Sequence, residues 1–241
     1  LIDLKSFRLM CDVTAKMDNT SSQYAKLPDD FSSLISTFQV FCGGVCISQA
    51  TSDYGVICKV LKLVKSSRDR DSSIDTLLTH GTMGAEDSDD DVSICFTPKT
   101  GLFDSDSRYL PSMLTGSVTI VIQFQTTAVL GFKTDSQSDL ATGYVLTNAT
   151  AKGKAQAATF TISNIHATCD TINMNNGFYE ATMLERINRG EDLQMVYKEY
   201  HTFRKSNIAS TSAEHTISLS SSSIDVLYSV FQPGNYTSTG I

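Results

Sequence analysis

The chain has 241 residues, of which 41% are hydrophobic and 19% charged, and its formal net charge is −7 at pH 7. This hydrophobic content excludes general disorder, and the acidic balance argues against a general electrostatic grip on nucleic acid. The longest apolar runs, such as Val118–Ile122, are far shorter than the roughly 18 residues that span a bilayer, so we expect no transmembrane segment.

Short strands dominate the predicted elements. Phe7, Leu9, Cys11 and Val13 follow a period of two, which places them together on one buried face of a strand. Gly43-Gly44 separates two further alternating runs and predicts a two-residue hairpin turn. In chain order, the predicted strands cover residues 7–13, 37–42, 45–48, 117–125, 159–166, 192–200 and 224–230.

Two helices interrupt the predicted strands. Apolar residues at helical spacing predict an amphipathic helix over 56–64, with a valine stripe toward the core and lysines turned away. The stripe consists of Val56, Val60 and Val64 with Ile57 and Leu61, and the lysines are Lys59, Lys62 and Lys65. A second helix is predicted over 178–189, with Asn176 as its N-cap and Gly190 in a left-handed C-terminal position.

The cysteines give no sign of a disulfide framework or a metal site. A chain of this size needs no disulfides for stability, and the Cys42-x3-Cys46 spacing is not that of a zinc knuckle. We expect all six thiols to be reduced, which suits assembly in a reducing cytoplasm. They are Cys11, Cys42, Cys46, Cys58, Cys95 and Cys169.

No catalytic, cofactor-binding or metal-binding constellation stands out, so we expect the protein not to be an enzyme and to need no cofactor. No two of the four histidines lie at the spacing of a helical metal pair. They are His80, His166, His201 and His215. The few strong charge clusters are expected to be solvated.

The acidic run Glu86–Asp91 has Asp87, Asp89 and Asp91 at the spacing of an EF-hand loop, but Val92 stands where a glycine is needed and Pro98 where the loop needs a glutamate. We expect a solvated loop there, with weak divalent-cation binding at a subunit contact as the alternative. The basic cluster is expected to be a solvated helix face, with a phosphate-binding patch as its alternative. Its members are Lys59, Lys62, Lys65, Arg68 and Arg70.

Three segments, in this order, resemble passages of double jelly-roll viral major capsid proteins, a lineage that includes those of large eukaryotic DNA viruses and virophages. The first runs from Leu27-Pro28-Asp29-Asp30-Phe31 to the Gly43-Gly44 turn, followed by Tyr54 and the predicted helix. The second is Phe96-Thr97-Pro98-Lys99-Thr100-Gly101-Leu102-Phe103 with Arg108-Tyr109-Leu110-Pro111 and the strand over 117–125. The third is the strand–helix–strand passage over 162–200, after which 218–232 resembles an early strand of a second roll.

The resemblance implies an all-β, antiparallel jelly-roll β-sandwich with one or two short helices. Residues 1–175 would form the first jelly roll, and 176–241 a linker helix and the first strands of an incomplete second roll. Such a protein is a structural component of the virion, assembled in the host cell. Its homotrimers form pseudo-hexagonal capsomers, which tile an icosahedral shell with neighbouring capsomers and with penton and minor capsid proteins. No specific nucleic-acid binding is expected from this segment.

The length does not suit a complete member of that family, because one eight-stranded roll alone uses on the order of 150–200 residues. Together with the start at Leu1, this predicts a partial chain. The alternatives are a single-jelly-roll penton or minor virion protein and a carbohydrate- or receptor-binding β-sandwich. The absence of Trp, the best sugar-stacking residue, counts modestly against the carbohydrate-binding module.

Overall fold

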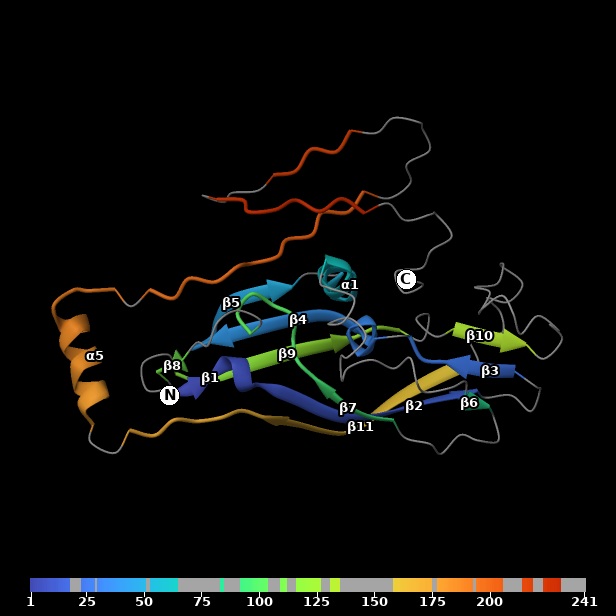
Figure 1. Cartoon of the computed structure of the whole chain (residues 1–241), viewed down its shortest axis with the longest axis horizontal. Coiled ribbons are helices and arrows are strands. Elements are labelled where there is room, and N and C mark those ends of the chain that lie inside the picture. The colour runs from blue at the N-terminus through green and yellow to red at the C-terminus, as the bar shows by residue number, and fades with distance from the viewer. Residues whose placement is uncertain are drawn as a thin grey trace.

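The computed structural model of the chain consists of antiparallel strands with two α-helices among the residues that it describes (Figure 1). The described residues are 1–17, 23–28, 30–50, 53–64, 83–84, 92–103, 109–111, 116–126, 131–134, 158–174, 177–192, 194–205, 214–218 and 223–230.

Most of the described elements are short strands. The strands are β1 (Ile2–Asp3), β2 (Arg8–Met17), β3 (Gln23–Lys26), β4 (Ile35–Cys42), β5 (Val45–Ala50), β6 (Met83–Gly84), β7 (Val92–Phe96), β8 (Tyr109–Leu110), β9 (Val118–Phe124), β10 (Gly131–Thr134) and β11 (Ala158–Thr168). The α-helices are α1 (Tyr54–Val64) and α5 (Phe178–Asn188), and the 3-10 turns are η1 (Leu4–Ser6) and η2 (Phe31–Leu34).

All strand pairs among the described residues are antiparallel. Two three-stranded sheets, β11-β2-β7 and β5-β4-β9, form the body of the molecule. A third, β10-β3-β6, lies at the far end in Figure 1, and the short pair β1-β8 lies near the N-terminus. The first long strand pairs with the last: Val13 of β2 faces Ile162 of β11.

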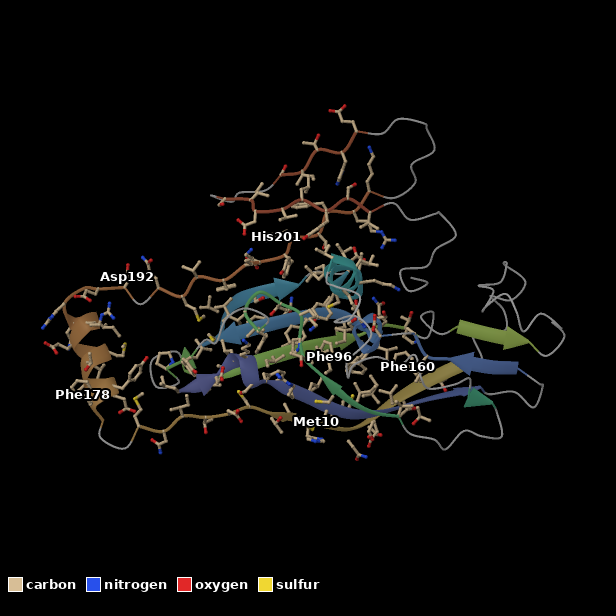
Figure 2. The ribbon with its side chains drawn as sticks, viewed as in Figure 1. Met10, Phe96, Phe160, Phe178, Asp192 and His201 are labelled. Atoms are coloured by element: carbon tan, nitrogen blue, oxygen red, sulfur yellow. The ribbon has the colours of Figure 1, made fainter. Side chains whose placement is uncertain are left out.

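The two main sheets share one hydrophobic core. Phe38 of β4 is fully buried and stacks on Tyr54 of α1, with ring centroids 5.4 Å apart. Phe96 of β7 meets the edge of Tyr54 and packs on Phe31 of η2, so the aromatic cluster joins strands of both sheets to the helix. Figure 2 shows Phe96 within this crowded interior. Helix α1 is therefore part of the hydrophobic core, which it covers on one side.

Five of the predicted strands are confirmed, namely those over 7–13, 37–42, 45–48, 117–125 and 159–166, as β2, β4, β5, β9 and β11. The hairpin turn between β4 and β5 is also confirmed. Gly43 and Gly44 have φ angles of 55° and 85°, the two positive values that a type I′ turn requires.

The predicted strands over 192–200 and 224–230 are wrong, because the described residues there pair with no other strand. Side-chain alternation itself persists: Met195 and Tyr197 pack against the core, whereas Val196 between them is 77% exposed. Alternation specifies which face a segment buries, but a strand also needs a neighbouring backbone in register. Figure 1 shows these segments as irregular chain on the β5 side of the molecule.

Helix α1 forms as predicted, and Ile57 and Leu61 of the predicted stripe lie toward the core, whereas the valines of the stripe are not among its buried residues. The buried residues are Tyr54, Ile57 and Cys58, whereas Val64 is 61% exposed. Stacking of Tyr54 on Phe38 sets the rotation of the helix, and hydropathy alone does not reveal such a contact. The prediction that the lysines face away is wrong for Lys62, which forms a 2.5 Å ion pair with the buried carboxylate of Asp30.

Helix α5 begins and ends close to its predicted bounds. Gly190 has φ of 78°, which confirms the left-handed C-terminal position. Gly177, with φ of 59°, is the N-cap and provides no side-chain hydrogen bond, and Asn176 lies outside the described residues. No residue of α5 is buried, so the helix contributes little to the core.

All six cysteines are free, and their reactivities should differ sharply. Burial raises the pKa of the Cys11 thiol from 9.0 to about 11, and the nearby Asp12 carboxylate adds to the shift. Cys46 is exposed. At pH 8, iodoacetamide should therefore modify Cys46 and spare Cys11 in the folded chain, as read by peptide mass spectrometry. Equal modification rates would contradict the burial of β2.

The raised pKa of Cys11 also makes the free energy of unfolding depend on pH. Between pH 9.0 and 11 only the unfolded chain ionises Cys11, so this thiol lowers the free energy of unfolding as the pH rises.

Candidate interaction surface

The most enzyme-like arrangement is a polar cluster on β2, β7 and β11. Ser93 Oγ and Asn164 Nδ2 each donate a hydrogen bond of 2.6 Å to the carboxylate of Asp12, and these bonds lower the pKa of Asp12, with His166 contributing weakly. The Ser93 hydroxyl donates to the carboxylate and not to the imidazole, so the cluster contains no Ser–His pair.

The cluster instead supports an irregularity of β11. The ladder between β11 and β2 shifts register between Ser163 and His166, and Asn164 has φ of 51° there. The side-chain amide of Asn164 donates a hydrogen bond to Asp12, and the backbone carbonyl oxygen of Asn164 lies 2.9 Å from His166 Nδ1. Side-chain hydrogen bonds of this kind fix a bulge in place, so the role is structural.

The other sequence candidates that the structure describes do not come together in one site. His201 and His215 are exposed, and His201 lies 3.6 Å from Glu199. Among the described residues, no group of three His, Cys, Asp or Glu side chains could hold a metal ion. His80, the acidic run 86–91, Lys65, Arg68 and Arg70 lie outside the described residues. Lys62 of the basic cluster is paired to Asp30, and with three of its five members outside the described residues the phosphate-binding alternative stays a hypothesis.

The feature that sequence reasoning missed is a surface. We call it the C-terminal surface: the exposed apolar side chains of 194–205, 214–218 and 223–230, three segments that lie next to one another in Figure 1. Leu227 at 75% and Val196 at 77% are the most exposed. The other members are Phe203, Ile217, Ile224, Val226, Tyr228 and Val230.

Specific contacts hold the first of these segments on the body of the protein. The Tyr197 hydroxyl donates to the Ile47 carbonyl of β5, and burial is the main cause of the raised pKa of Tyr197. Gly101 approaches the backbone of Lys198 so closely that a Cβ would lie 1.5 Å from the Lys198 carbonyl oxygen. The segment is therefore docked, and its outward side chains are presented to solvent.

One ion pair ties residues 223–230 to this segment, and a second ties the segment itself to the residue before α1. Lys198 forms a 2.9 Å pair with Asp225, and this contact raises the pKa of Lys198. Arg204 lies 3.5 Å from Asp53, which precedes α1. In each pair at least one of the two charged side chains is more than half exposed, so each pair contributes only weakly to stability. The pairs join charged groups of these segments, and the apolar side chains beside them stay exposed.

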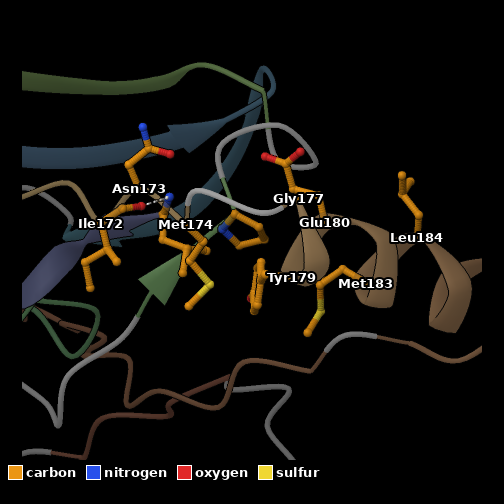
Figure 3. A pocket seen from close by; sticks show the side chains of 10 residues that line it. Ile172, Asn173, Met174, Gly177, Tyr179, Glu180, Met183 and Leu184 are labelled. Atoms are coloured by element: carbon orange, nitrogen blue, oxygen red, sulfur yellow. Dashed lines mark hydrogen bonds between the residues drawn. The ribbon is translucent and has the colours of Figure 1, made fainter.

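A second apolar feature lies beside α5. A cavity of about 180 Å³ is bordered by Met174, Tyr179, Met183 and Pro111 among others, as Figure 3 shows for the labelled residues. Phe178, at the start of the same helix, is 73% exposed and lies at the outer end of the molecule in Figure 2. The exposed apolar area therefore extends beyond the C-terminal surface.

Comparison with protein-family models, with curated proteins and with solved structures found no match for this chain. Within the described part of the chain, no helix has the length and apolar character needed to cross a membrane. A sequence signal for the C-terminal surface did exist, since Ile224, Val226 and Tyr228 alternate without a core position of their own.

Proposed function

We propose that the protein is a structural capsid subunit of the double jelly-roll lineage, which acts by self-assembly and not by catalysis. In this proposal residues 1–175 form the first jelly roll, and 176–241 supply a linker helix and the opening strands of a second. Homotrimers would form pseudo-hexagonal capsomers of an icosahedral virion shell, in contact with neighbouring capsomers and with penton and minor capsid proteins.

The topology supports the jelly-roll part of the proposal. In Greek-key arrangements a late strand returns to lie beside the first one, and β11 does so beside β2 along nearly its whole length. Two antiparallel sheets around one core, with a helix closing one side, are also what the resemblance implies. These features favour a roll over a simple meander, in which sequential strands are neighbours.

The C-terminal surface is the observation that carries the assembly part. Isolated apolar side chains are ordinary on a protein surface, but contiguous apolar patches mark interaction sites. Among the described residues, eight apolar side chains of these three segments are at least 42% exposed, and Leu227 and Val196 reach 75% and 77%. Association with further strands or subunits would cover these side chains.

Charge substitutions within this surface test the proposal. Leu227→Glu should abolish the trimer, because it places a carboxylate in the apolar contact, whereas the folded subunit should persist since Leu227 is exposed. Ser229→Glu, a change of the same charge two residues away, is the matched control. Light scattering gives the mass and circular dichroism the fold. A trimer that survives Leu227→Glu would contradict this role of the surface.

A further inference from the structure

Strand β9 forms an open edge of the β5-β4-β9 sheet. Among the residues that the structure describes, β9 pairs with β4 and with no other strand. Its inward side chains are only partly buried: Ile120 and Ile122 pack against the core without being covered by it. Phe38 and Val40, opposite them on the central strand β4, are fully buried. This difference in burial is expected when β4 lies in the middle of the sheet and β9 lies at its edge.

The residues of β9 itself carry no charge or proline that would prevent strand pairing, and the register shift of its ladder with β4 lies at the end, between Ile35 and Thr37 of β4. Edge strands of soluble monomers are blunted by charges, prolines or bulges. The sequence Val118-Thr119-Ile120-Val121-Ile122-Gln123-Phe124 contains no charge, no proline and no glycine. By contrast, the central strand β2 carries Arg8 and Asp12, and β11 has its register shift at Asn164. An uncharged edge that is rich in β-branched residues is suited to be covered by another strand.

The same seven residues are also symmetric in character about Val121. Ile120 and Ile122 are identical, Thr119 and Gln123 are both polar, and Val118 and Phe124 are both apolar. A contact across a two-fold axis requires such self-complementarity, because each residue meets its counterpart on an identical strand. We infer that β9 pairs with β9 of a second copy of this chain, antiparallel and with Val121 opposite Val121.

This register preserves the two faces of the sheet. Ile120 would face Ile122 of the second copy on the core side, and Thr119 would face Gln123 on the outer side. The outer side already carries a polar contact, since Thr37 Oγ1 donates to Gln123 Oε1 at 3.3 Å. A slip of one residue would place apolar against polar positions. The result is a continuous six-stranded sheet through two subunits. This two-fold contact is separate from the proposed trimer and does not depend on it.

Cysteine trapping tests the register. In a Cys46→Ser background, which removes the exposed native thiol, Val121→Cys should give a disulfide-linked dimer upon oxidation with diamide. Thr119→Cys is the matched control, because the two copies of residue 119 would lie about 13 Å apart along the strands. Disulfides need Cα atoms within about 7 Å. The double variant Thr119→Cys/Gln123→Cys should link again. Mass after non-reducing electrophoresis is the readout.

Two results would overturn the inference: Val121→Cys links no more than the Cys46→Ser parent, or Thr119→Cys alone links as well as Val121→Cys. Val121→Lys provides a second measurement without oxidation. Val121 is 43% exposed, so the fold should persist, and like charges facing each other should remove the two-fold contact. Loss of the contact with the trimer mass unchanged supports the inference. Failure of the trimer in the parent itself contradicts the proposed function and leaves the β9 test standing.

Discussion

Phe38→Ala is expected to lower the free energy of unfolding by about 3–5 kcal/mol, the usual cost of removing a buried aromatic side chain. Phe38 is fully buried, stacks on Tyr54 and meets the edge of Phe103 at 6.0 Å. Its loss therefore opens a cavity where β4, α1 and the 100–103 turn meet. Since domains are stable by about 5–15 kcal/mol, a shift of the urea midpoint should be large.

The control for this prediction is the same substitution at Phe178, which is 73% exposed at the start of α5. Exposed substitutions away from special features change stability by about 0.5 kcal/mol or less. Urea unfolding followed by circular dichroism compares the two variants. Similar midpoints for Phe38→Ala and Phe178→Ala would show that the aromatic cluster is not the centre of the core.

Ile57→Asp is expected to have a comparable effect, a loss of several kcal/mol, because it places a carboxylate in the contact between α1 and the core. Ile57 is 8% exposed, no basic residue lies three or four positions from it on the helix, and Lys62 is already paired with Asp30. Thermal unfolding should show a lower Tm for this variant.

The matched control is Leu63→Asp on the same helix, because Leu63 is 61% exposed. It should melt close to the parent. If both variants melt alike, α1 does not pack by its Tyr54–Ile57–Cys58 side, and the rotation described for this helix is wrong.

Local pattern was sufficient for much of the fold. Period-two burial located β2 and β9, and Gly43-Gly44 located a turn, because these signals reflect backbone geometry within a few residues. The rotation of α1 could not be predicted in this way. It depends on Phe38, which lies in another element and reaches the helix only in the folded chain.

The pairing of strands that are far apart in the chain could not be predicted from the sequence for the same reason. The pairing of Val13 with Ile162 joins residues far apart in the chain, and no local pattern records it. Alternation over 192–200 and 224–230 indicated which side chains face together, but strand formation depends on a neighbouring backbone that the described residues do not supply. The alternation of Ile224, Val226 and Tyr228 was therefore a signal of a shared face, but only the structure showed that these side chains are exposed.

The central claim, that this β-rich subunit exists to assemble, is tested most directly by native mass spectrometry of the unmodified protein over a range of concentrations. The account predicts complexes whose mass is three times that of one subunit, or a multiple of that value. A single subunit at every concentration, with the side chains of the C-terminal surface still exposed, would contradict it.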